Sequence, residues 1–215
     1  MKVQVINKDT VDAALDILKN CNTKRVCILN FANETNPGSA WRSGVIAQEE
    51  DICRRTSLHL TLNKKFYPLR YEDAIYSTEV LVIRENFASQ HKLFDVTRPE
   101  TLPSISVISM AAIYAPKTDS GRTKYLDPVE RDQMKSQIRL TLSIAAVNSH
   151  RYLVVGAFGC GHYKHPLQDS AQCWKEVLQE PEFSCRWEGI YFAITGGRNK
   201  NGISIYQEAL DGLTV

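Results

Sequence analysis

Three consecutive acidic residues, Glu49, Glu50 and Asp51, follow Gln48 in a segment that has the composition of a helix start. Acids are common there simply because they complement the helix dipole. Two adjacent glutamates can also divide labour, because neighbouring side chains on a helix diverge by about 100°. One carboxylate can then orient a sugar hydroxyl while the other, removed from water, donates a proton. Cleavage of a glycosidic bond needs such a donor, because the leaving oxygen must be protonated as the bond breaks.

The loop before these acids is rich in turn-forming residues and runs from Asn30 to Gly44 with the sequence NFANETNPGSAWRSG. It follows a predicted strand, Arg25 to Phe31, and therefore lies at the carboxyl end of the sheet, where open α/β folds bind ligands. Its main-chain amides can bind phosphate oxygens, and Asn33 and Asn36 can hydrogen-bond sugar hydroxyls or a base. The alternative is an ordinary turn capped by asparagine.

A second glycine-rich loop runs from Gly156 to Pro166 with the sequence GAFGCGHYKHP. It follows the predicted strand Tyr152 to Val155 and precedes an amphipathic segment. Glycines between a strand and a helix allow main-chain amides to wrap a diphosphate. Their spacing matches neither the Walker motif nor the dinucleotide GxGxxG motif. Close packing of the strand on the helix is the alternative.

The elements that must position these loops alternate between β-rich and helical patterns, which predicts a three-layer α/β/α sandwich around a mixed sheet. The predicted strands are Val3 to Ile6, Arg25 to Phe31, Val80 to Ile83, Ile105 to Ser109, Tyr152 to Val155 and Ile190 to Ile194. The predicted helices are one behind an Asp9 cap, one behind Asp127-Pro128-Val129-Glu130 that carries Met134 to Ala145, and three at Ile46 to Leu60, Gln168 to Leu178 and Ile203 to Leu210.

The organisation of the chain indicates one domain, residues 1–215, because no repeat, low-complexity tract or linker divides it. Arg84 to Pro103 has weak periodicity and is interpreted as a long surface loop or insertion that could form a lid over a site. We expect a monomer by default.

Composition excludes some classes of function. A formal net charge of +2 gives no field strong enough to hold duplex nucleic acid, so we expect no broad nucleic-acid surface. No apolar run approaches the roughly 20 residues that span a bilayer, and the amino terminus lacks a signal-peptide core. The six cysteines form no CxxC pair, so we expect a soluble intracellular protein, cytoplasmic or nuclear.

Both loops resemble those of one enzyme family. Asn30-Phe31-Ala32-Asn33, Pro37-Gly38 and the run from Gln48 to Arg55 resemble the signature of microbial-type poly(ADP-ribose) glycohydrolases, which belong to the macrodomain superfamily. Gly156 to Gly161 resembles the diphosphate loop of that family. Segments elsewhere fall in family order, so the resemblance spans nearly the whole chain.

The resemblance implies residue roles. Glu50 would be the general acid, Glu49 and Asn33 would hold ribose, and Tyr163, two residues past the last glycine, would flank the distal ribose. No cofactor is implied, and the partner would be ADP-ribose or its polymer, attached to protein. The substrate-binding residues predicted on this basis are Asn33, Gly38, Ser39, Ala40, Gln48, Gly156, Ala157, Phe158, Gly159, Cys160, Gly161, His162 and Tyr163.

The first loop departs from the family pattern, which carries three consecutive glycines where this chain has Gly38-Ser39-Ala40 followed by Trp41. An alanine with positive φ costs roughly 1 kcal/mol. We expect such strain to tilt the ribose away from Glu50. Trp41 is interpreted either as a new wall of the pocket or as surface packing.

The second loop also carries one cysteine and two histidines, which are side chains that can bind a metal ion. Cys160, His162 and His165 match no standard zinc spacing, so no metal site is predicted. Cys160 is expected in a buried turn. Lys164 and His165 add positive charge near the phosphates or occupy a solvated surface, while His59, His91 and His150 are expected to be structural or exposed on helix or loop surfaces.

Three functions remain open from the sequence. The first is hydrolysis of the linkage between ADP-ribose units by Glu50. The second is a reader that binds ADP-ribose without cleaving it, because Ser39 and Ala40 spoil the geometry. The third is hydrolysis of a mono-ADP-ribosyl bond to protein or nucleic acid, which uses the same pocket with a different leaving group.

Overall fold

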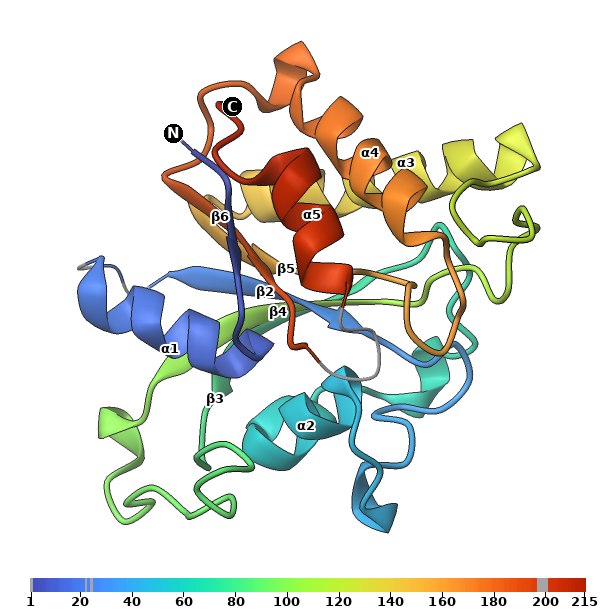
Figure 1. The fold of residues 1–215 in the computed structure, drawn as a ribbon. Coiled ribbons are helices and arrows are strands. Elements are labelled where there is room, and N and C mark those ends of the chain that lie inside the picture. Colours follow the sequence, from blue (N-terminus) through green and yellow to red (C-terminus); the bar gives the residue numbers. More distant parts are fainter. Residues whose placement is uncertain (1, 22, 24, 197–200) are drawn as a thin grey trace.

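The computed structural model describes residues 2–21, 23, 25–196 and 201–215. A six-stranded sheet with the order β1-β6-β5-β2-β4-β3 crosses the molecule (Figure 1). All neighbouring strands are parallel except β3, which pairs antiparallel with β4. The strands are β1 Gln4–Ile6, β2 Val26–Phe31, β3 Ile75–Leu81, β4 Ser104–Met110, β5 Tyr152–Val155 and β6 Gly189–Ala193.

Helices cover both faces of this sheet. They are α1 Thr10–Asn20, α2 Gln48–Arg55, α3 Pro128–Val147, α4 Leu167–Leu178 and α5 Gly202–Leu210. Side chains of α3, α4 and α5 share one apolar cluster with the sheet, and those of α1 and α2 share another on the opposite face (Figure 1). The predicted three-layer sandwich around a mixed sheet is confirmed.

Local sequence explains where the two best-defined helices begin. The Asp9 carboxylate accepts a hydrogen bond from the Asp12 amide at 2.9 Å, and Asp127 accepts one from the Val129 amide at the same distance. Pro128 occupies the first position of α3, where its missing N–H costs nothing. Each cap therefore satisfies a donor that the helix itself cannot.

One predicted strand is wrong at its start. The strand expected from Val80 begins at Ile75, because β3 includes an irregularity between Ser77 and Val80 that interrupts the alternation of side chains. Glu79 has a φ of 52° at this irregularity. Ile83 was expected at the end of the strand, but its amide donates instead to the Arg55 carbonyl at 2.8 Å.

The predicted helix from Ile46 to Leu60 is shorter in the structure. Helix α2 ends at Arg55 because Thr56 is extended, with φ −133° and ψ 170°. The Thr56 hydroxyl donates to the Ile52 carbonyl and accepts from the Leu58 amide. A separate 3₁₀ turn, η2 Ser57–Leu60, follows. Hydroxyl bonds of this kind compete with helical ones and end the helix.

The segment from Arg84 to Pro103 is a loop, as predicted, with one short 3₁₀ turn at Pro99–Thr101. Asn86 donates to Asp12 at 2.6 Å, and His91 lies 3.4 Å from Asp51. Asp51 and Glu49 are two residues apart on α2 and point in nearly opposite directions. The first bond attaches the loop to α1 and the second attaches it to the face of α2 opposite Glu49, which does not support the predicted lid.

Arg55 connects this loop to α1 and α2, the two helices that cover one face of the sheet. Its side chain is 0% exposed, and its guanidinium binds the carboxylates of Asp9 at 2.7 Å, Asp51 at 3.3 Å and Asp12. Its Nε donates to the Arg84 carbonyl at 3.4 Å. Because Asp9 and Asp12 belong to the start of α1, Asp51 to α2 and Arg84 to the loop, one buried cation holds these three segments together.

His150 is buried, which corrects the prediction of a surface position. Its Nε2 lies 2.7 Å from the Tyr76 hydroxyl under the end of α3, and burial lowers its pKa.

Among the described residues, no helix is both long and apolar enough to cross a membrane.

We predict that Arg55→Ala lowers the free energy of unfolding by about 3 kcal/mol, because it empties a buried site and leaves three partly buried carboxylates without their cation. Urea unfolding followed by circular dichroism measures this loss. Arg151→Ala is the matched control, because Arg151 is exposed and its one ion pair among the described residues is with Glu188, at 2.9 Å. We expect it to cost at most about 1 kcal/mol. Equal effects of the two substitutions would contradict the role given to Arg55.

Candidate active site

The carboxyl ends of β2, β4 and β5 lie at one edge of the sheet because these strands are parallel. The two loops predicted from the sequence leave the sheet there, one between β2 and α2 and the other between β5 and α4. They meet although they are far apart in the chain. The Glu34 amide donates to the Tyr163 hydroxyl oxygen at 3.3 Å, and the Tyr163 hydroxyl donates to the Glu34 carboxylate.

Both glutamates at the start of α2 are buried, Glu49 with 3% and Glu50 with 5% of their surface exposed. The Asn33 amide donates to Glu49 Oε2 at 2.8 Å, and the Asn30 Nδ2 lies 3.4 Å from Glu49 Oε1. The carboxylate of Glu49 is therefore held against the first loop. Burying two adjacent acids without a basic partner is costly unless they are hydrogen-bonded or neutral.

Burial raises the pKa of the Glu49 carboxyl to about 7. The hydrogen bonds from Asn33 and Asn30 act in the opposite direction because they stabilise the charged form, while the charge of Glu50 raises the pKa further. Loss of water is the largest cause. Glu49 therefore exchanges its proton near neutral pH.

Gln48 has a different position from the one predicted. Its Oε1 accepts from the Phe31 amide at 2.8 Å, and its Nε2 donates to the Leu29 carbonyl at 2.7 Å and to the Thr10 hydroxyl at 3.1 Å. The carboxamide is thus used within the protein. These bonds make Gln48 a positioning residue that holds α2 against β2 and α1.

Asn33 shapes the first loop. Its Oδ1 accepts from the amides of Thr35 at 2.9 Å and Asn36 at 2.8 Å, which forms the Asx turn expected of asparagine in a loop. Its Nδ2 makes no hydrogen bond to the described residues of the chain. One side chain therefore fixes the turn and keeps a donor for another partner.

The strain expected at Ala40 lies one residue earlier. Ser39 has a φ of 52°, whereas Ala40 has a φ of −103°, which any residue adopts. Gly38 has a φ of 71°, and a Cβ there would lie 2.9 Å from Trp41 Cδ1 and 3.1 Å from Cys53 Sγ. Gly38 is therefore required, Ser39 is strained and Ala40 is relaxed.

Trp41 packs beside His59, with ring centroids 4.7 Å apart, and the Arg42 guanidinium lies 5.1 Å from its ring centroid. These three side chains line a cavity of about 260 Å³ together with Pro37, Ser39, Ala40 and Ser43. Trp41 thus forms a wall of a hollow next to the first loop.

The three glycines of the second loop have different environments. A Cβ on Gly156 would lie 2.8 Å from the Ala193 carbonyl oxygen, so this glycine allows the loop to pass close to β6. Gly159 has a φ of 76°, and a Cβ there would lie 2.7 Å from the His165 ring. A Cβ on Gly161 would meet no atom of the described residues within 4 Å. Of these three glycines, only Gly161 is left unexplained by contacts with that part of the chain.

The residues between and after these glycines divide into buried and exposed ones. Phe158 is a core residue whose ring centroid lies 5.6 Å from that of Phe31, and Ala157 is partly buried against the same core. Cys160 is half-buried rather than in the fully buried turn predicted, and loss of water around its thiol raises the pKa to about 11. His162 is exposed, and its ring lies near Tyr163, with centroids 5.8 Å apart.

His165 is buried and contributes no charge, which corrects both of its predicted roles. Burial lowers its pKa to about 4. Its Nε2 lies 2.7 Å from the Ile113 carbonyl and donates to it, so its Nδ1 accepts from the Tyr125 hydroxyl at 2.7 Å. Lys164 is exposed, with a φ of 63°. His165 therefore supports the loop from beneath, under Gly159.

Within residues 2–21, 23, 25–196 and 201–215, no group of three or more His, Cys, Asp or Glu side chains is arranged to hold a metal ion.

Comparisons with known proteins point to one family. The family model "Microbial-type PARG, catalytic domain", where PARG is poly(ADP-ribose) glycohydrolase, matches residues 1–85, which include the first loop and α2. The predicted resemblance is confirmed. A search of curated proteins gives no match.

Solved structures of PARG proteins have the same fold as this PARG-like chain. The enzyme from Thermomonospora curvata bound to the inhibitor ADP-HPD is 22% identical, with a TM-score of 0.81 over 96% of this chain and 78% of that chain. The enzyme from Deinococcus radiodurans in complex with ADP-ribose is 24% identical, with a TM-score of 0.79 over 97% of this chain and 83% of that chain.

Sequence patterns did not assign a role to three side chains of this site. Glu34 lies inside the first loop, but its partner Tyr163 is 129 residues away. Asn30 belongs to a predicted strand, where side chains are expected to pack in the core, yet its Nδ2 lies 3.4 Å from Glu49 Oε1. The Tyr67 phenol is buried close enough to Glu49 for that charge to raise its pKa, and no sequence motif marks it.

We predict that Glu49 makes stability depend on pH. In the folded chain the pKa of Glu49 is about 7, whereas the ordinary pKa of a glutamate is 4.5. The protonated form of Glu49 therefore stabilises the fold fully below pH 4.5, and this stabilisation is lost as pH rises through 7. The full loss is about 3 kcal/mol. Urea unfolding between pH 4.5 and 8 should show this slope flattened in Glu49→Gln. Glu208→Gln, an exposed change on α5, should leave the slope as in the wild type. The same slope in all three proteins would contradict the shift.

A second prediction separates the glycines. Gly159→Ala should lower the free energy of unfolding by about 2–4 kcal/mol, because positive φ and overpacking against His165 act together. Gly161→Ala should change it by no more than about 0.5 kcal/mol. Thermal unfolding of the two variants checks this difference, and a destabilised Gly161→Ala would contradict it.

Proposed function

We propose that this protein hydrolyses the glycosidic linkages between ADP-ribose units of poly(ADP-ribose) and releases ADP-ribose. The observation that carries the proposal is the burial of Glu49 and Glu50 side by side at the start of α2, at the edge of the sheet where the two loops meet. The reported complexes of similar PARG proteins with ADP-ribose and ADP-HPD support this choice of ligand.

In the proposed reaction Glu50 is the general acid. The glycosidic C–O bond breaks as the leaving oxygen takes the proton of Glu50, and the ring carbon gains oxocarbenium character. Water then adds its oxygen to that carbon and returns a proton to the Glu50 carboxylate. No metal or redox cofactor is required for this balance.

The other side chains bind and orient. Glu49 holds a ribose hydroxyl together with the Nδ2 donor of Asn33, since Asn33 Oδ1 is occupied within its turn. Amides from Gly156 to Gly161 cradle the diphosphate, and Gly161 permits close approach because no described residue fills the space beside it. Tyr163 packs on the sugar, held in place by Glu34.

We also propose a domain organisation and a cellular location for the protein. We propose one catalytic domain, supported by the pairing of β1 with β6 and of Lys2 with Thr214, which joins the two ends of the chain. The six cysteines are free thiols, which fits a reducing intracellular compartment.

We predict that Glu50→Gln lowers kcat on poly(ADP-ribose) by about 10²–10⁴-fold, because the amide keeps the shape but carries no transferable acid proton. Calorimetric affinity for ADP-ribose should remain within a few-fold of the wild type. Free ADP-ribose released from polymer is the measured product. Degradation of polymer by Glu50→Gln at the wild-type rate would show that Glu50 is not the acid.

Two other results would select the remaining functions. Binding of ADP-ribose without release from any substrate would indicate a reader, and the strain at Ser39 is the feature that favours it. Ser39→Gly should then restore turnover. Release only from mono-ADP-ribosylated protein or DNA would indicate a hydrolase of that bond.

A further inference from the structure

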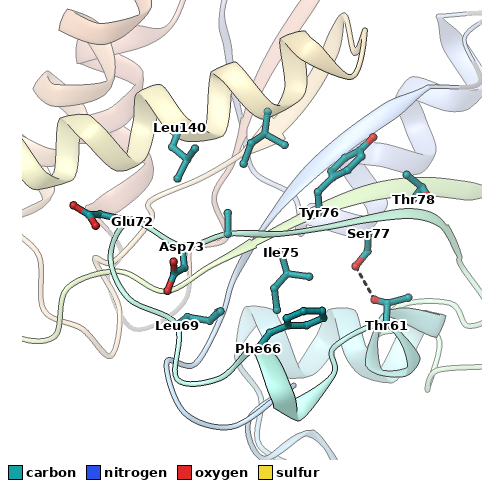
Figure 2. A pocket seen from close by; sticks show the side chains of 12 residues that line it. Thr61, Phe66, Leu69, Glu72, Asp73, Ile75, Tyr76, Ser77, Thr78 and Leu140 are labelled. Carbon is teal, nitrogen blue, oxygen red and sulfur yellow. Dashed lines mark hydrogen bonds between the residues drawn. The ribbon is translucent and has the colours of Figure 1, made fainter.

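A second, larger hollow lies outside the glutamate site, along the free edge of the sheet. It has a volume of about 800 Å³, within the ~300–1,000 Å³ that ligand pockets occupy. Its floor is the first half of β3, Ile75 to Thr78. Leu140 and Ile144 of α3 form one wall, and Phe66 and Leu69 form the other (Figure 2). We call this hollow the β3 groove.

The edge of β3 is protected along only half of its length. At the far end, the Leu81 amide donates to the Ser57 hydroxyl at 3.0 Å, and Val82 pairs with Thr56. Between Ile75 and Thr78, the main chain makes no hydrogen bond to any described segment other than β4. An edge strand with unpaired main-chain groups is a template for another extended chain.

The walls suit the alternating side chains of a strand. Successive side chains of an added strand point to opposite sides, so one set would meet Leu140 and Ile144 and the other would meet Phe66 and Leu69. Phe66 is 51% exposed, although it is aromatic. Four residues of floor correspond to about 13 Å of extended chain.

Charge at one end indicates what the chain should carry. Glu72 and Asp73 lie at the entrance beside Ile75, as Figure 2 shows, and none of the groove-lining residues is basic. Both carboxylates are exposed; one accepts from the Tyr71 hydroxyl at 2.8 Å and the other from the Arg70 amide. Lys65 is nearby, but its ammonium lies 4.9 Å from the Phe66 ring centroid. A lysine or arginine at the end of the bound segment would complement this pair.

The groove also begins at the edge of the sheet that carries the glutamates. Asn30, Ser109 and Ile75 lie in register across β2, β4 and β3, so Ile75 is about 10 Å from the residue that contacts Glu49. The Leu69 amide donates to the Glu34 carbonyl at 2.7 Å, which joins the wall of the groove to the first loop.

We propose that the β3 groove binds an extended, basic polypeptide segment as an added strand, and that this segment belongs to the protein to which the ADP-ribose chain is attached. The second half of this proposal rests on the proposed hydrolase function. The groove would give the enzyme a contact with the modified protein in addition to its contact with the nucleotide.

Peptide binding is tested first, without catalysis. The probe is the fluorescein-labelled peptide Lys-Val-Thr-Val-Thr-Lys, with Glu-Val-Thr-Val-Thr-Glu for comparison, measured by fluorescence anisotropy. Phe66→Ala and Glu72→Lys should each weaken binding of the basic peptide at least tenfold. The matched controls are Leu60→Ala, at a leucine that is 76% exposed on the preceding turn, and Glu79→Lys, at an exposed acid of β3 outside the groove.

Three results would each overturn the proposal that the β3 groove binds a basic peptide. The basic peptide could fail to bind, the acidic peptide could bind equally well, or the groove variants and the controls could lose the same amount of affinity. Thermal unfolding midpoints show whether each variant folds. All four positions are exposed, so we expect these midpoints to stay close to that of the wild type.

The link to the substrate is tested by kinetics on poly(ADP-ribose), either free or attached to a serine beside the basic sequence. The groove variants should raise KM at least about tenfold for the attached polymer, with kcat and the KM for free polymer unchanged. Unchanged KM for the attached polymer in variants that bind the peptide poorly would overturn the assignment of the acceptor. No ADP-ribose from either substrate would instead refute the proposed function, while the anisotropy result would stand by itself.

Discussion

Parallel pairing of β2 with β4 and β5 is the constraint on which the rest of this structure depends. It brings the carboxyl ends of strands from distant parts of the sequence to one edge of the sheet. The loops that follow β2 and β5 must then lie side by side, and Glu34 and Tyr163 join them. A sheet with either strand reversed would place one loop at the opposite edge and leave no shared site.

The position of the acids depends on how a short helix is held. Helix α2 has 8 residues, and Ala47 before it supplies no side-chain cap. Isolated helices of this length are unstable in water, so tertiary contacts must fix it. The Gln48 carboxamide attaches the first turn to β2, and the Arg55 guanidinium attaches the last turn to α1. Glu49 and Glu50 lie between these two anchors.

Much of the fold and the position of the site could be predicted from the sequence, because apolar runs mark buried strands and both loops follow strands. What could not be predicted depends on tertiary contacts. The hydroxyl of Thr56 ends α2 through local bonds that periodicity does not reveal. Positive φ falls on Ser39 and not on Ala40, a difference that residue types alone do not specify. His165 is neutral because it lies beneath Gly159, a relation visible only in three dimensions.

The raised pKa of Glu49 has a consequence for how an anion reaches the site. Two ionised carboxylates at the edge of the sheet would repel a diphosphate, and with little water between the groups that repulsion would be poorly screened. Burial raises the pKa of the Glu49 carboxyl to about 7, so this group gains its proton more readily near neutral pH than an exposed glutamate does. The same loss of hydration that makes its burial costly therefore lowers the electrostatic barrier to association, and a decrease in pH should speed the arrival of a phosphate-bearing molecule.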